Sequence, residues 1–211
     1  MEDLSELLLD VQTSIANMQL PDPALRQYYI DLENREYWIT GDIDDSLLTL
    51  VRLIIDCNKE DAGVEVNTRK PIKIFINSNG GDIQILWTVI NAIRVSKTPV
   101  YTINTCAAYS AAAYLMASGH KRYALPGTNF MLHSGSRCYS GDADQVDSTK
   151  KYFDRLSKKL INYFISKVNI DNKTYKKKTV TDWFFDEEDA LSIGLIDKVV
   201  DDLDEICVSK S

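Results

Sequence analysis

The sequence predicts an α/β domain in which short strands alternate with helices and pair largely in parallel. Short apolar runs of strand length recur along the chain, and several are followed by apolar residues at helical spacing. The 211-residue length suits one domain with a small extension, and it can bury a proper core. Hydrophobic residues make up 45% and charged residues 26%, which is typical of a globular chain.

The N-terminal residues predict an amphipathic helix that lies outside the main domain. Its apolar residues share helical spacing, and they are Leu4, Leu7, Leu8, Val11, Ile15 and Met18. Pro21 and Pro23 end this pattern. We therefore expect an N-terminal helical extension over residues 1–21, packed on the body or on a neighbouring subunit, and the main domain over residues 22–211.

The main domain begins with a strand and a helix. Residues 37–40 are mostly aromatic and β-branched, which predicts a strand. Asp44 or Asp45 suits the N-cap of a helix through Asn58, because apolar residues recur there at helical spacing: Leu47, Leu48, Val51, Ile54 and Ile55. The polar residues 59–70 predict a loop.

Two strand–turn–helix units come next. Residues 72–77 predict a strand, residues 78–82 a turn, and a helix follows to about Ser96. Residues 100–104 predict another strand, followed by a closely packed, Ala-rich helix over residues 110–118.

The rest of the chain predicts two short strands and two helices. The strands cover residues 122–124 and 130–132. Residues 142–168 predict a long amphipathic helix, whose apolar residues are Val146, Phe153, Leu156, Leu160, Tyr163 and Phe164. A short helix near residues 186–193 ends at Gly194, a suitable C-cap.

Charge and hydropathy exclude several classes of function. Lys and Arg number 24 against 31 Asp and Glu, so the formal net charge is −7 and a nucleic-acid binder is not expected. No apolar stretch approaches the roughly 20 residues of a membrane-spanning helix. The acidic first residues do not suit a secretory signal, so we expect a cytoplasmic protein.

The spacing of glycines, cysteines and histidines excludes further classes of site. The glycines match neither a P-loop, nor G-x-G-x-x-G, nor G-x-S-x-G. The cysteines form no C-x-x-C pair, and we expect four reduced, mostly buried thiols at Cys57, Cys106, Cys138 and Cys207. With only two histidines, a multi-histidine metal site is not expected.

Two strand–turn–helix junctions carry residues suited to chemistry. Paired glycines at Gly80 and Gly81 let backbone N–H groups turn toward a ligand at a helix start, although a plain tight turn gives the same pattern. Ser110 stands where the strand over residues 100–104 gives way to a helix. There it is either a nucleophile or an ordinary N-cap serine.

A serine nucleophile also needs a base and a group that orients the base. His133 follows an apolar run at a strand end, whereas His120 lies in a predicted surface turn, so His133 is the better placed base. Asp182 precedes the aromatic run that begins at Trp183. It is either a partly desolvated, hydrogen-bonded carboxylate or the cap of a helix.

Taken in order, these residues resemble the ClpP family, which comprises the proteolytic subunits of the Clp protease. The resemblance runs from about Tyr37 to Val200, and Gly81 and Ser110 are 29 residues apart, as in the family. The motifs that carry it are I-N-S-N-G-G at 76–81, A-A-Y-S-A at 107–111, Y-A-L-P at 123–126, F-M-L-H at 130–133, D-W-F-F-D-E-E-D-A at 182–190 and G-L-I-D at 194–197.

The resemblance implies a ClpP/crotonase-type fold and a serine endopeptidase with no metal or organic cofactor. It implies Ser110 as nucleophile, His133 as base and Asp182 as the residue that orients the base. The backbone N–H groups of Gly81 and Ala111 are implied as the oxyanion hole. The long helix over 142–168 would be the handle that joins two rings.

The resemblance also implies an assembly and partners. These are two stacked heptameric rings, a tetradecamer, with active sites facing an inner chamber. A separate AAA+ ATPase would unfold polypeptide substrates and feed them in.

Asn79, Cys106, Tyr109 and Thr181 depart from the family pattern and mark a divergent member. Thr181 replaces an arginine that the family often uses between rings, so we expect a fragile ring–ring contact. Three alternatives stay open: a viral-type maturation protease, a non-catalytic ring subunit and a crotonase-like acyl-CoA enzyme.

Overall fold

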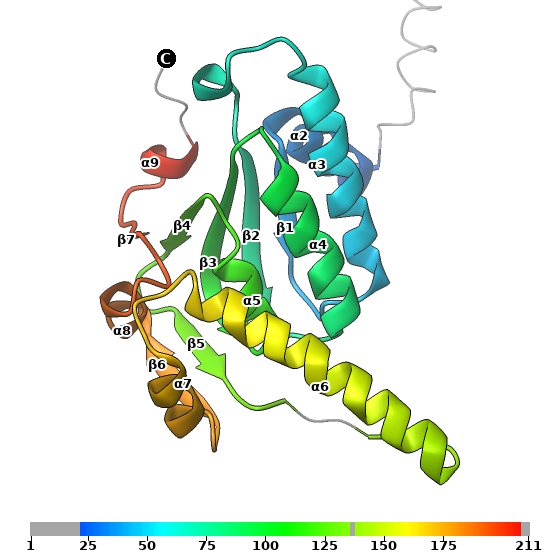
Figure 1. The fold of residues 1–211 in the computed structure, drawn as a ribbon. Helices are drawn as coiled ribbons and strands as arrows, with labels where there is room; N and C mark the ends of the chain where they lie inside the picture. The colour runs from blue at the N-terminus through cyan, green and yellow to red at the C-terminus, as the bar shows by residue number, and fades with distance from the viewer. Residues whose placement is uncertain (1–21, 136–137, 208–211) are drawn as a thin grey trace, which may run out of the picture. The chain divides into compact units, whose positions relative to one another are not determined.

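The structure, a computed structural model, describes residues 22–135 and 138–207 (Figure 1). The chain divides into two units, one ending at Asn34 and one beginning at Arg35. In the first unit, the described residues form helix α2 (Pro23–Asn34), which was not predicted. Pro23 suits the first helical position because it lacks the N–H that would be unpaired there. The helix predicted over residues 1–20 lies outside the described residues.

The second unit is built on a seven-stranded sheet whose main path has the order β1-β2-β3-β4-β7. Strand β5 pairs with β3 beside this path and β6 pairs with β5, so the sheet branches at β3. All pairs are parallel except β5–β6. The strands are β1 (Glu36–Ile39), β2 (Ile72–Ser78), β3 (Val100–Tyr109), β4 (Lys121–Ala124), β5 (Asn129–Leu132), β6 (Trp183–Asp186) and β7 (Lys198–Val199).

Helices cover this sheet and connect its strands (Figure 1). They are α3 (Leu48–Glu60), α4 (Ile83–Val95), α5 (Ala111–Met116), α6 (Ala143–Ile165), α7 (Asn172–Lys178), α8 (Glu187–Ser192) and α9 (Asp204–Cys207). Aspartate side chains accept backbone N–H groups at several helix starts, at Asp82, Asp142, Asp171 and Asp186. Asp44 does the same at the 3₁₀ helix Asp45–Leu47, which leads directly into α3. These caps satisfy donors that have no partner inside the helix.

The predicted α/β class is confirmed, and most predicted elements appear close to their expected bounds. Among those that differ in length are one strand and one helix. Strand β3 continues to Tyr109, five residues past its predicted end, because its first half pairs with β4 and its last residues pair with β5. Helix α6 ends at Ile165 rather than at residue 168. Helices α7 and α9 and strands β6 and β7 were not predicted.

The core of the second unit lies between the sheet and its helices. Isoleucines of β2 and apolar residues of α4 are fully buried against each other: Ile72, Ile74, Ile76, Leu86, Val89, Ile90 and Ile93. All six residues of α5 are buried, as its Ala-rich sequence predicts. In α6 the buried residues are Leu160 and Phe164, both in its second half. The first half of α6 is mostly exposed and extends away from the sheet (Figure 1).

The expectation that the cysteines are mostly buried is wrong. All four are free, but Cys57 alone is buried, on the inner face of α3. Cys106 lies in the part of β3 beyond its pairing with β4, Cys138 between β5 and α6, and Cys207 in the last helix. Burial raises the pKa of the Cys57 thiol to about 11, so this thiol stays protonated and unreactive at neutral pH.

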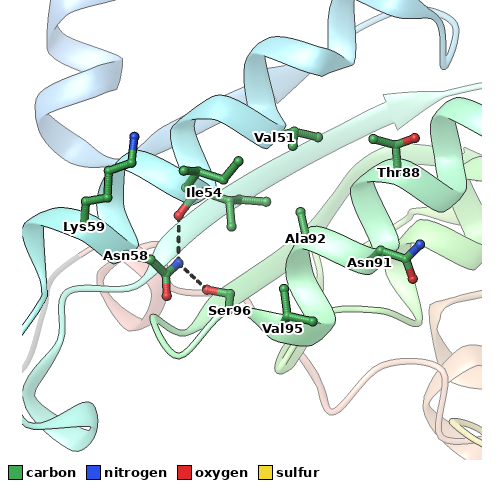
Figure 2. Close-up of a pocket in the computed structure, with 10 residues that line it drawn as sticks. Val51, Ile54, Asn58, Lys59, Thr88, Asn91, Ala92, Val95 and Ser96 are labelled. Atoms are coloured by element: carbon green, nitrogen blue, oxygen red, sulfur yellow. Dashed lines mark hydrogen bonds between the residues drawn. The ribbon is translucent and has the colours of Figure 1, made fainter.

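An apolar groove lies between α3 and α4 (Figure 2). It has a volume of about 580 Å³, and its apolar residues include Val51, Ile54, Ala92 and Val95. At one end, Asn58 Nδ2 donates to the carbonyl of Ile54 and to Ser96 Oγ, each at 2.7 Å. No carboxylate, histidine or thiol lines this groove, so it holds no groups for acid–base or nucleophilic chemistry.

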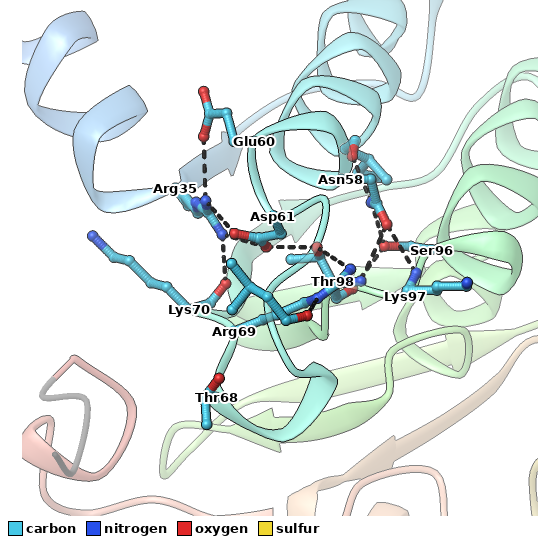
Figure 3. A network of polar contacts seen from close by, with 12 residues as sticks. Arg35, Asn58, Glu60, Asp61, Thr68, Arg69, Lys70, Ser96, Lys97 and Thr98 are labelled. Atoms are coloured by element: carbon cyan, nitrogen blue, oxygen red, sulfur yellow. Dashed lines mark hydrogen bonds and ion pairs between the residues drawn. The ribbon is translucent and has the colours of Figure 1, made fainter.

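A network of polar contacts around Arg35 ties together segments that are distant in sequence (Figure 3). Arg35 has φ of 57°, and its guanidinium donates to both Asp61 carboxylate oxygens at 2.8 and 2.9 Å. It also donates to the Lys70 carbonyl, and the Thr98 hydroxyl donates to Asp61 at 2.7 Å. The network therefore joins the start of β1, the end of α3 and the segments that enter β2 and β3.

The Arg35–Asp61 pair predicts a pH-dependent loss of stability in Arg35→Met. The two side chains are 12% and 9% exposed, and removing one partner of a buried pair costs about 3 kcal/mol. The hydrogen bond from Arg35 lowers the pKa of Asp61. The stabilisation is therefore present above the unfolded pKa, about 4, and is lost as pH falls through the lower folded pKa.

Urea denaturation of the wild type and of Arg35→Met between pH 3 and pH 7 measures this loss of stability. We expect the difference between their free energies of unfolding to be largest at pH 7 and to shrink below about pH 4. Lys59→Met is the control, because Lys59 pairs with Asp56 on the surface and should contribute less than about 1 kcal/mol. A difference in the free energy of unfolding that stays constant from pH 3 to pH 7 would contradict the assignment of this stability to the ion pair.

Candidate active site

The branch of the sheet formed by β3, β5 and β6 brings three predicted site residues to one end. Tyr109 of β3 lies opposite Met131 of β5, and Leu132 of β5 lies opposite Trp183 of β6. Ser110 directly follows β3, His133 directly follows β5, and Asp182 directly precedes the antiparallel β6. The register of the three strands therefore fixes the neighbourhood of these side chains.

Ser110 occupies a sharp turn between β3 and α5. Its φ is 51°, a left-handed conformation that is uncommon for residues other than glycine. Its N–H donates to the Met131 carbonyl at 2.8 Å, which ties the turn to β5. The side chain makes no capping hydrogen bond, and Ser110 Oγ lies 2.7 Å from His133 Nε2. Ser110 therefore stands at the N-cap position of α5, but its side chain does not act as the cap.

His133 lies between the serine and the aspartate. Its Nδ1 faces Asp182 Oδ1 at 3.7 Å, which is longer than a hydrogen bond. The His133 side chain is 26% exposed and the Asp182 side chain 59% exposed. Asp182 is thus neither a desolvated carboxylate nor a helix cap, because β6 follows it and Asp186 caps α8.

The second histidine, His120, lies elsewhere. Its Nδ1 accepts the backbone N–H of Val100 at 2.9 Å, so its ring holds the start of β3. Partial burial and the nearby Lys167 ammonium lower the pKa of His120. The structure therefore brings His133, and not His120, to Ser110.

The glycine turn that follows β2 is held by a parallel bridge to Ile43. The Ile43 N–H donates to the Gly80 carbonyl, and the Asp82 N–H donates to the Ile43 carbonyl. In a parallel bridge of this kind, the N–H of the central residue, Gly81, points away from Ile43. Gly81 has φ of 151°, and a Cβ there would lie 2.4 Å from the Ile43 carbonyl oxygen. A side chain at this position would therefore break the turn.

The same turn packs directly against Ser110. A Cβ on Gly80, where φ is 105°, would lie 2.8 to 2.9 Å from Tyr109 O, Ala111 N and Ser110 Cβ. Ala111 is the first residue of α5, so its N–H has no acceptor within the helix. Close packing of glycine against the serine turn thus brings the predicted donor segments, at Gly81 and Ala111, to the same region as Ser110.

A narrow cavity of about 40 Å³ opens beside Ser110. Its wall combines polar residues of the site with apolar residues from α6, and the lining is Ile83, Ser110, Ala111, Tyr114, His133, Ser134, Gly135, Ser157, Leu160 and Ile161. Tyr114 was not predicted as a site residue, although it stands one helical turn after Ser110, in α5. Its hydroxyl is hydrogen-bonded to that of Tyr175 in α7, and burial raises the pKa of both phenols.

Within residues 22–135 and 138–207, no three His, Cys, Asp or Glu side chains gather into a group that could hold a metal ion. The helices of these same ranges include none with the length and hydropathy needed to span a bilayer.

The chain is similar to proteins of known family over most of its length. It is 27% identical over 181 residues to the ATP-dependent Clp protease proteolytic subunit 2 of Treponema denticola, which covers 84% of this chain and 86% of that protein. It is 29% identical over 137 residues to the ATP-dependent Clp protease proteolytic subunit of Deinococcus radiodurans, covering 64% of this chain and 67% of that one. The family model of the Clp protease matches residues 35–202, a range that includes every strand described above. The chain therefore belongs to the Clp protease family, and this membership supports a protease role.

Proposed function

We propose that this chain is a serine endopeptidase that hydrolyses peptide bonds of unfolded polypeptides. The observation that carries the proposal is the 2.7 Å separation of Ser110 Oγ and His133 Nε2, at the mouth of a cavity and beside the glycine turn. A hydroxyl within hydrogen-bond distance of an imidazole nitrogen is the arrangement that lets a base activate a serine.

The first step is attack on the peptide carbonyl. His133 Nε2 takes the proton of Ser110 as Oγ bonds to the carbonyl carbon. The carbonyl oxygen gains negative charge, and the backbone N–H groups of Gly81 and Ala111 stabilise it. Each such donor is worth roughly 3–4 kcal/mol of barrier.

The remaining steps release the two products. His133 gives the proton to the leaving amine, and water then hydrolyses the acyl-enzyme with His133 again as the base. Asp182 orients the imidazole and stabilises its charged form. At 3.7 Å, the Asp182–His133 pair must close by about 0.5–1 Å to form a hydrogen bond, and such tightening on substrate binding is common in serine enzymes.

We also propose the assembly and partner that the family implies. The relatives are named as proteolytic subunits of an ATP-dependent protease, so a separate AAA+ ATPase would unfold substrates for this chain. Two stacked heptameric rings would enclose the sites, with the exposed half of α6 reaching across the ring–ring contact. The division into an extension over 1–21 and a peptidase domain over 22–211 stays a prediction.

Labelling with a fluorophosphonate tests the chemistry, because this probe reacts with activated serine nucleophiles. We expect mass spectrometry to find the label on Ser110 and short peptides to be cleaved without ATP. A folded protein should be degraded only when an ATP-driven unfoldase is added. Labelling at another residue, or no labelling of the assembled protein, would reject the peptidase.

A further inference from the structure

The outward face of the strand branch carries a row of three large side chains. Tyr109 of β3 lies opposite Met131 of β5, which lies opposite Phe184 of β6. The neighbouring row, Ala108, Phe130 and Phe185, is buried in the core. Because side chains alternate along a strand, Tyr109, Met131 and Phe184 share the opposite face.

A ring contact crosses this row from one outer strand to the other. The rings of Tyr109 and Phe184 meet edge to face, with centroids 5.6 Å apart and planes at 89°. This is a favoured geometry for aromatic pairs. Among the described strands, β6 pairs with β5 alone, so this contact links β3 to β6 without a shared backbone ladder.

The core side of the branch lacks an equivalent ring contact to β3. There Phe130 and Phe185 stack with centroids 5.5 Å apart, which ties β5 to β6. The residue of β3 in that row is Ala108, which has no ring. The outward pair of Tyr109 and Phe184 is therefore suited to set how close β6 lies to the strand that carries Ser110.

We propose that Tyr109 is a positioning residue that acts through Phe184 to set the distance between Asp182 and His133. The proposal rests on the proposed peptidase function. Phe184 is two residues from Asp182, and Asp182 precedes the first residue of β6. Since the Asp182 side chain is more than half exposed, its place depends chiefly on the strand that follows it.

The Asp182–His133 distance makes the site sensitive to the contact between Tyr109 and Phe184. Asp182 Oδ1 and His133 Nδ1 are 3.7 Å apart, which is already beyond hydrogen-bond range. A further outward shift of β6 would keep Asp182 beyond hydrogen-bond distance of His133 even when substrate binds. Misplacement of a catalytic group by about 1 Å can cost about 10²-fold in rate. The effect should fall on kcat, because neither ring lines the cavity beside Ser110.

Steady-state kinetics on a short peptide tests the proposal. We expect Tyr109→Ala to lower kcat by about 10- to 100-fold with KM changed less than about twofold. Tyr109→Phe should restore kcat, because the contact uses the ring. Phe184→Ala should lower kcat to a similar degree, and Phe184 is 59% exposed, so this variant should fold. The double variant should be no slower than either single one.

Tyr101→Ala is the matched control. Tyr101 lies on the same strand, and its ring meets that of Tyr123 with centroids 5.8 Å apart and planes at 75°. Loss of this pair should leave kcat unchanged if Tyr109 acts on the site rather than on β3 as a whole. Additive effects of Tyr109→Ala and Phe184→Ala, a failure of Tyr109→Phe to restore kcat, or an effect on KM alone would overturn the proposal. A wild-type protein whose Ser110 is not labelled by a fluorophosphonate would instead reject the proposed function.

Discussion

Ser110→Ala is expected to abolish peptide cleavage and fluorophosphonate labelling while the protein stays folded. The substitution removes the oxygen that lies 2.7 Å from His133 Nε2. Loss of a serine nucleophile lowers kcat by about 10⁴-fold or more. Stability should fall by only about 1 kcal/mol, the worth of one hydrogen bond.

Peptide hydrolysis and thermal unfolding of the same samples check this result. Ser192→Ala is the control, because Ser192 is an exposed helical serine whose hydroxyl donates to the Asp189 carbonyl. It should keep full activity and labelling. Substantial activity in Ser110→Ala would mean that another group is the nucleophile, and the proposed function would fail with it.

The second large effect concerns the two histidines. His133→Ala is expected to lose several orders of magnitude in kcat, because the Ser110 hydroxyl then loses the imidazole nitrogen that lies 2.7 Å away. His120→Ala should retain most of the activity. It removes an acceptor for the Val100 N–H and should instead lower stability by about 1–2 kcal/mol.

Measuring kcat and the free energy of unfolding for both variants separates these roles. The expected pattern is a kinetic defect without instability in His133→Ala and the reverse in His120→Ala. The opposite assignment would show that the base is His120, and the geometry at Ser110 would then have no catalytic meaning.

Much of the fold followed from the sequence because apolar spacing determines it. The buried isoleucines of β2 and the Ala-rich α5 are local patterns, and both appear where they were expected. The second half of β3 was missed because residues 105–108 are small or polar. Their strand conformation depends on pairing with β5, which is distant along the chain.

The site followed from the sequence to a lesser extent. The sequence pattern alone did not distinguish Ser110 as a nucleophile from Ser110 as a capping residue. In the structure its hydroxyl is hydrogen-bonded to His133 and makes no capping hydrogen bond. The exposure of Asp182 could not be foreseen, since its neighbour Trp183 suggested a buried setting. Nothing local in the sequence pointed to the Arg35–Asp61 pair, whose members are 26 residues apart.

The branch of β3, β5 and β6 has a consequence for biosynthesis. The serine and the aspartate that flank His133 are separated by 72 positions, from 110 to 182. A nascent chain translated as far as α6 already contains Ser110 and His133, but it has neither β6 nor Asp182. Because synthesis runs from the N-terminus, β6 emerges from the ribosome after β3 and β5. The order of strands therefore delays the arrangement of Ser110, His133 and Asp182 until β6 has been synthesised and has paired with β5.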